Sequence, residues 1–151
     1  MSSPCFVNRF DLNDVELTAT GPLVRVEILR EGTFNHPKKK FRVDENLINE
    51  LHANFSSGLL GTELPVDEDH LDPRFSRAKG WIVKTEPGVR PDGKKALFAF
   101  VKPTASMVRP IKDGEVKYFS PSIAFNKEIT EEGKQKTANV LRGGAWTNIP
   151  F

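Results

Sequence analysis

The chain has 151 residues, the size of one ordinary domain, and its apolar share of 38% suffices for a single core. Its 22 basic and 20 acidic residues nearly cancel, which argues against a nucleic-acid-binding protein with a clustered basic face. One cysteine, Cys5, excludes an internal disulfide and favours a reducing compartment. Residues 1–6 do not form a secretory signal, and no apolar run reaches the ~18–20 residues that cross a bilayer. We therefore expect a cytosolic protein without membrane contact.

The N-terminal part of the chain is predicted to begin with weakly ordered structure and one clear strand. Residues 1–20 are polar and weakly patterned, which is typical of a loose arm or an edge strand. Residues 23–30 alternate, with Val24, Val26 and Ile28 on one face, which predicts a half-buried strand. The stretch 32–40, with a proline and three lysines, is predicted to be a loop, and 41–43 a short strand.

The clearest helix is predicted to start at Asp44, whose side chain can cap the free N–H groups. Its apolar face is formed by Leu47, Ile48, Leu51 and Phe55, and the helix is expected to end at 56–58. A short extended piece at 64–66 then leads into the acidic run at 67–70.

The C-terminal part is predicted to be rich in strands. Four strands are expected, at 78–85, 96–101, 116–125 and 138–147, with turns at 91–93 and 130–133. Residues 96–101 are apolar on both faces, so this strand is expected to be central, and a brief helix at 105–111 is expected to break at Pro110. Since neighbouring strands can pair through hairpins, the pattern predicts an α+β domain with a mainly antiparallel, barrel-like sheet.

Ser120 is the first candidate for chemistry. Period-two alternation places Phe119 and Ile123 on the core face of the strand at 116–125, and Ser120 and Ser122 on the opposite face. Pro121 cannot donate to a ladder, so the strand is expected to be interrupted or at an edge there, which would give a nucleophile local access. The alternative is that both serines are polar residues of a solvated sheet face.

His70 is the candidate base for this serine. A serine hydroxyl needs a base within hydrogen-bond reach, and histidine can accept and return a proton near neutral pH. The alternative is an exposed loop histidine in an acidic run. His36, which precedes a proline and lysines, and His52, at the edge of the helix's buried face, are weaker candidates.

Two further stretches carry residues that could form a binding site. A calcium-type site would use Asp67, Asp69, Asp72 and His70, but the loop lacks the glycine and the later glutamate of the common calcium loop, so we expect no metal and no cofactor. The lysines at 38–40 are expected to form a solvated turn rather than a phosphate or nucleic-acid site, because no aromatic residues are interleaved with them.

Five short segments resemble the prohead (capsid-maturation) proteases of tailed phages, especially the Mu-like protease/scaffold family. These segments are 66–70 (VDEDH), 78–82 (AKGWI), 96–104 (ALFAFVKPT), 118–123 (YFSPSI) and 144–150 (GAWTNIP). The resemblance implies a fold like that of herpesvirus assemblins, a strand-rich barrel with flanking helices, and a serine endopeptidase with Ser120 as nucleophile and His70 as base. The rival interpretation is an inactive scaffold or assembly module of the same fold.

The resemblance also implies the setting of this activity. The substrates would be phage scaffold and major capsid proteins, and also the protease itself, inside the assembling prohead in the bacterial host cytoplasm. Residues 1–151 would be a single protease domain, which a scaffold segment can follow, and a homodimer is one state that assemblins adopt.

The third catalytic residue departs from the family pattern. Some relatives carry an aspartate before the long helix, where this chain has lysines, and no histidine follows His70. Asn148 is a weak candidate, as are Asp67 and Asp69, which would share a side if extended. Arg142, followed by two glycines, could position a water or donor, although a surface role is the simpler interpretation.

Overall fold

The computed structural model describes residues 8–10, 14–18, 21–36, 39–69 and 77–148, which form ten strands and two helices. In chain order these elements are β1 (Asn8–Arg9), β2 (Val15–Thr18), β3 (Gly21–Arg30), β4 (Gly32–His36), β5 (Lys39–Val43), α1 (Glu45–Ser56), β6 (Leu64–Glu68), β7 (Gly80–Val89), β8 (Lys95–Pro103), α2 (Ala105–Lys112), β9 (Tyr118–Glu131) and β10 (Lys134–Thr147). The class is α+β, as predicted. Neither helix is long and apolar enough to cross a membrane, within the described residues.

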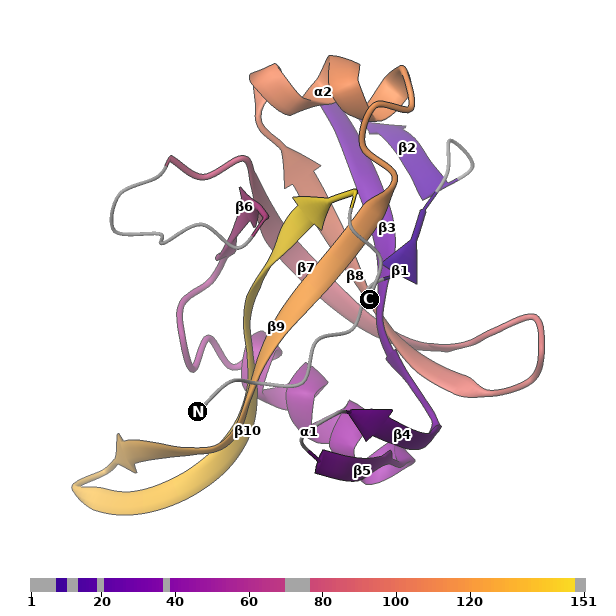
Figure 1. Ribbon diagram of the computed structural model, residues 1–151. Helices are drawn as coiled ribbons and strands as arrows, with labels where there is room; N and C mark the ends of the chain where they lie inside the picture. Colours follow the sequence, from indigo (N-terminus) through magenta and orange to yellow (C-terminus); the bar gives the residue numbers. More distant parts are fainter. Residues whose placement is uncertain (1–7, 11–13, 19–20, 37–38, 70–76, 149–151) are drawn as a thin grey trace.

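Eight of the strands form one curled sheet in the order β1-β9-β10-β6-β7-β8-β3-β2. All neighbours are antiparallel except β6 and β10, which run parallel. The sheet curls so that β1 contacts β3, and α1 and α2 lie at opposite ends of it (Figure 1). In the described residues no ladder joins β1 to β2, so the expected barrel is not closed. The two short strands at the edges agree with the edge strand expected in residues 1–20.

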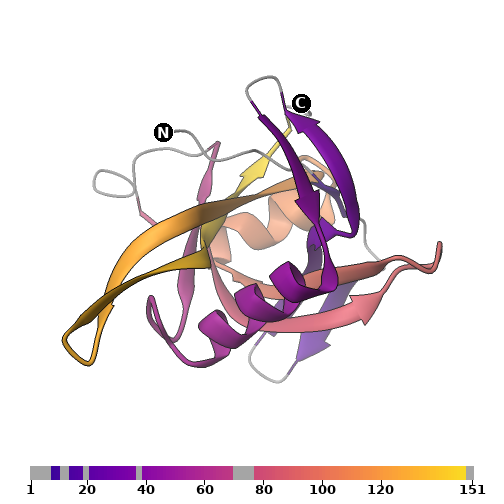
Figure 2. The ribbon, with the colours of Figure 1, turned by 90° about the horizontal axis from the view of Figure 1, so that it is seen from below.

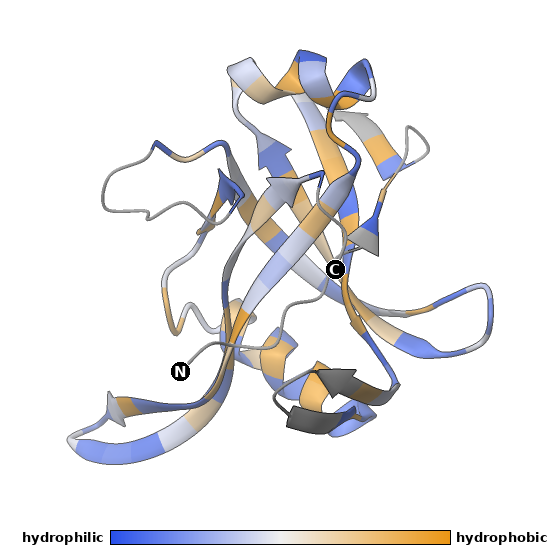
Figure 3. Cartoon of the chain, in the orientation of Figure 1, coloured by the Kyte–Doolittle hydropathy of each residue, from blue (hydrophilic) through white to orange (hydrophobic). Residues whose placement is uncertain are grey.

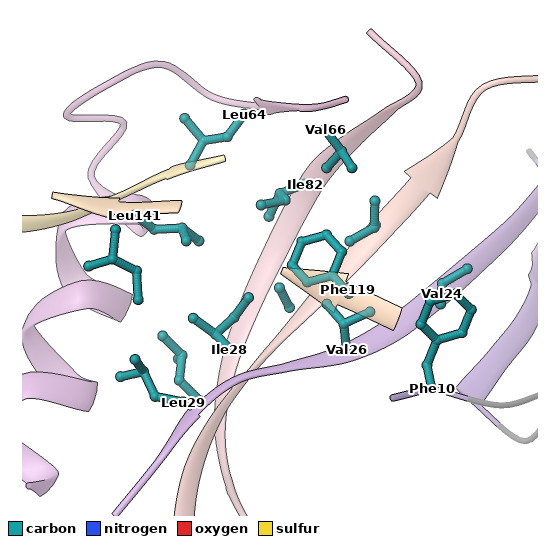
Figure 4. Packing of buried hydrophobic residues seen from close by; sticks show 14 of the residues in the cluster. Phe10, Val24, Val26, Ile28, Leu29, Leu64, Val66, Ile82, Phe119 and Leu141 are labelled. Carbon is teal, nitrogen blue, oxygen red and sulfur yellow. The ribbon is translucent and has the colours of Figure 1, made fainter. Parts of the chain in front are cut away.

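The concave side of the sheet holds the hydrophobic core. Val24, Val26 and Ile28 are all buried, as their alternation predicts, and Phe119 packs among them (Figure 4). Trp146 of β10 stacks edge-on against Phe119, with ring centroids 5.6 Å apart. Side chains from strands β3, β6, β7, β8, β9 and β10 and from both helices join this single cluster.

Helix α1 follows the predicted cap and apolar face. Asp44 accepts a hydrogen bond from the Leu47 N–H at 2.9 Å, and the chain leaves the helix at Ser57. Ile48 and Leu51 are buried against the sheet, and in the view from below the helix lies in front of it (Figure 2). His52 lies at the edge of this face and pairs with Thr85 Oγ1 of β7 at 2.7 Å.

Two predictions about local structure were wrong. The stretch 32–40 is not a loop, because β4 and β5 pair as a small separate hairpin from Gly32–Val43 to His36–Lys39. Helix α2 does not break at Pro110 but continues to Lys112. Pro110 lacks the N–H that would donate to the carbonyl of Ser106. Ser106 is exposed, so water can reach this carbonyl instead.

Strands β9 and β10 are longer than predicted and protrude as a hairpin. They remain paired from Tyr118–Thr147 to Glu131–Lys134, and Glu132 and Gly133 both have positive φ in the two-residue turn. The outer half of the hairpin is largely hydrophilic (Figure 3), so hydrophobic alternation does not mark it.

Candidate functional site

Ser120 lies in a row of three residues that crosses three neighbouring strands. On β10, Ala145 is the register partner of both Ser120 on β9 and Asp67 on β6. Register partners point to the same face of a sheet, so these three side chains share the face opposite the core. Strands are about 4.8 Å apart, which places the Cα atoms of Ser120 and Asp67 roughly 10 Å apart.

Ser120 is less accessible than expected. Its exposed fraction is 1%, and Ala145 beside it is fully buried, although both lie on the face away from the core. The alternative interpretation, in which both serines are polar residues of a solvated sheet face, is therefore wrong for Ser120. Ser122 is half-buried. Ser120 therefore lies in a covered position of the sheet.

Pro121 does not interrupt β9. It pairs with Gly144, and β1 on the other side of β9 reaches only Tyr118 and Phe119. The carbonyl of Lys117, four residues earlier on the same side of the backbone, accepts from Phe10 on the β1 side. The proline nitrogen therefore points away from β10, where no bond of the β9–β10 ladder is lost.

Two glycines allow β10 to fit between β9 and β6. A Cβ on Gly144 would collide with the Phe119 ring, and one on Gly143 would collide with the Pro65 carbonyl oxygen. Gly143 also has a φ of 154°, next to a register irregularity in β10. The glycine pair therefore sets the close approach that aligns Asp67, Ala145 and Ser120.

His70 lies outside the described residues, so the structure does not test the predicted Ser120–His70 pair. The residue before it is described. Asp69 has a positive φ of 56° and donates its N–H to the Trp146 carbonyl at 3.0 Å. Strand β6 therefore ends beside Trp146 of β10, which is the register partner of Phe119. Because its φ is positive, Asp69 does not continue the extended conformation that would place it on the same side as Asp67.

The candidates for a third residue have different surroundings. Asn148 is exposed, and its amide holds the segment before β9: Nδ2 donates to the Glu115 carbonyl at 2.5 Å, and Oδ1 accepts from the Lys117 N–H at 3.1 Å. Both ends of this amide serve as a structural clamp. Asp67 instead shares the face of Ser120, and its Oδ1 atom is buried. Arg142 is exposed.

The His52–Thr85 pair is a hydroxyl–imidazole contact that sequence reasoning missed. Thr85 is on β7, is 3% exposed and faces His52 of α1. The contact ties α1 to the sheet. The spacing of 33 residues gives no sequence signal for it.

A metal centre has no support in the described part of the chain. No group of three or more His, Cys, Asp or Glu side chains is placed there to hold an ion. Two of the four residues considered for such a site, His70 and Asp72, lie outside the described residues.

Comparison with known protein families identifies the family of this chain. The family described as "Mu-like prophage I protein, N-terminal domain" matches residues 26–150. The chain belongs to this family. No curated protein and no solved structure matched the chain. The Mu-like match includes Asp67, Ser120 and Ala145, so the whole row across β6, β10 and β9 lies within the family's domain.

Proposed function

We propose that this Mu-like prophage protein is a serine endopeptidase that cleaves phage scaffold and capsid proteins, and itself, during prohead maturation. The observation that carries the proposal is the row itself. Ser120 on β9 lies on the same face of the sheet as Asp67 on β6. Strand β6 is two strands away from β9, and it precedes His70 in the sequence. Asp69, two residues after Asp67, is the last described residue before His70.

The proposed chemistry is acyl transfer. The imidazole of His70 removes the proton of Ser120 Oγ, which attacks a peptide carbonyl, and the imidazolium returns the proton to the leaving amine. Backbone N–H groups stabilise the oxyanion, at roughly 3–4 kcal/mol per donor in well-studied proteases. Asp67 is the better candidate for an orienting carboxylate, because it shares the face of Ser120 while Asn148 is committed to a backbone clamp.

The burial of Ser120 adds a requirement to this mechanism. A polypeptide cannot reach a hydroxyl that is 1% exposed, so a local opening must precede attack. The same burial favours a second candidate function, an inactive assembly module that keeps the fold. The proposed kinship with assemblins is supported by the curled, mainly antiparallel sheet with a helix at each end, and it is compatible with both functions.

A pair of serine variants tests the proposal. Ser120→Ala should abolish cleavage of co-expressed scaffold protein and lower the free energy of unfolding by about 1 kcal/mol or less. Ser122→Ala, on the same face two residues away, should keep cleavage within a few-fold of the original. Cleavage by Ser120→Ala at the original rate would disprove the assignment.

Covalent labelling separates the enzyme from the inactive module. An enzyme should gain the mass of a serine-directed phosphonate at Ser120, and mildly destabilising conditions should speed the reaction by opening the buried site. Self-cleavage of a longer precursor should also disappear in His70→Ala. An assembly module would show no labelled Ser120 under any of these conditions and no self-cleavage.

A further inference from the structure

Trp81 is an exposed aromatic residue on the face of the sheet that carries Ser120. It is 38% exposed, whereas the other tryptophan, Trp146, is buried in the core. The ladder between β6 and β7 pairs Trp81 with Pro65, and Leu64 and Ile82 on the opposite face are buried. Trp81 therefore points away from the core, as Ser120 does. Its indole combines a large apolar body with a polar N–H, a combination that is enriched at interfaces.

A continuous row connects Trp81 to the neighbourhood of Ser120. Ser122 on β9 pairs with Gly143 on β10, Gly143 lies against Pro65 on β6, and Pro65 pairs with Trp81 on β7. The three residues before the tryptophan are small or compact. A chain lying across them would meet its first large side chain at Trp81.

On the next strand, β8, the residue beside Trp81 carries a positive charge. The register partner of Trp81 on β8 is Lys102, which is exposed and has no ion pair with an acidic residue in the described ranges. Lysine next to an indole offers an apolar contact and a cation within a few ångströms of each other. The two side chains suit a polypeptide that carries an apolar residue beside an acidic one.

We propose that Trp81 and Lys102 form a substrate subsite of the peptidase, which takes an apolar side chain and a neighbouring carboxylate. This inference rests on the proposed function of Ser120. Three strand spacings and two residues along the strand separate Ser120 from Trp81, a Cα distance of roughly 16 Å. An extended peptide covers this distance in about five residues, so the subsite selects a residue about five positions from the cleaved bond.

Cleavage of a defined peptide set tests the subsite. The set consists of internally quenched peptides that carry Phe or Ala, and Glu or Gln, at each position up to six residues from the cleaved bond. Trp81→Ala should raise KM for the Phe- and Glu-containing peptides about tenfold and leave kcat within twofold, and it should remove the preference for Phe. Trp81→Phe should restore most of the preference for Phe. Lys102→Met should remove the preference for Glu alone.

Val89→Ala is the matched control. Val89 lies on the same strand and is 63% exposed, but it is outside the row, so its loss should change neither preference. Unchanged KM and unchanged preferences in Trp81→Ala would overturn the subsite and leave the assignment of Ser120 intact.

Binding without cleavage distinguishes this failure from failure of the proposed function. In a Ser120→Ala background, the preferred peptide should shift the tryptophan emission to shorter wavelength as Trp81 leaves water. The shift should vanish in Ser120→Ala/Trp81→Phe, since Trp146 is already buried. A shift that persists in the double variant would contradict the subsite, even if no peptide is cleaved by the original chain.

Discussion

Gly144 lies on β10 against the ring of Phe119, on the core side of the sheet. Its φ is not in the left-handed region, so the backbone alone would accept a side chain. The ring leaves no room for one. At this residue, packing rather than backbone conformation requires glycine, and the same residue brings β10 close enough for Ala145 to sit between Ser120 and Asp67.

Gly144→Ala should therefore destabilise the protein by about 1–3 kcal/mol, the usual cost of overpacking a core. The collision is with one ring, so the cost of Gly144→Ala should be smaller when it is introduced into Phe119→Leu than into the original chain. Urea unfolding of both single variants and the double variant measures this coupling. Additive costs would show that the ring does not cause the strain.

At the scale of elements, an ion pair joins the start of α1 to the start of β8. Lys95 Nζ lies 2.6 Å from Glu45 Oε2, and the Lys95 N–H donates to Glu31 Oε1 at 2.6 Å. The hydrogen bond to Glu45 raises the pKa of Lys95 above its ordinary value of 10.5. The negative charges of Glu45 and Glu31 also raise it, against a lowering by desolvation.

This raised pKa has a defined effect on stability. The folded chain holds the proton of Lys95 more tightly than the unfolded chain, so the ion pair contributes fully below pH 10.5, and its contribution disappears as the pH rises through the raised pKa. Glu45→Gln should return the pKa of Lys95 toward 10.5 in an NMR titration. Glu86→Gln, which removes the partner of Lys84 instead, should leave it unchanged.

Local patterns predicted those elements whose hydrophobic periodicity is complete. The alternation of β3 and the capped, amphipathic α1 were confirmed almost to their ends. The hairpin of β4 and β5 was missed because its sequence, from Gly32 to Val43, is dominated by polar residues and has a proline at its centre. The outer half of β9 and β10 was missed because only its turn, Glu132-Gly133, carries a local signal.

At the scale of the whole molecule, one hydrophobic cluster includes residues from both helices and from both halves of the curled sheet. With a single core, we expect the chain to unfold in one step. In Trp81→Phe, Trp146 becomes the sole tryptophan, so its fluorescence reports β10 while circular dichroism at 222 nm reports the helices. The two denaturation curves should coincide. Separate midpoints would show that the halves unfold independently.

The candidate site could be predicted only in part, because its geometry depends on long-range register. Alternation placed Ser120 correctly on the face opposite Phe119. It could not show that Ala145, from the C-terminal strand, would separate Ser120 from Asp67, nor that the serine would be buried. The pairing with His70 stays a prediction.

The position of β10 in the sheet also determines when this site can exist. β10 follows every other described strand in the sequence, yet it lies between β9 and β6 and is the only link between them. A nascent chain that has emerged only as far as Ser122 already carries the serine and the acidic run, but nothing holds them together. Ribosomes add about 5–20 residues per second, so the row of Asp67, Ala145 and Ser120 can form only a second or more after the serine is made.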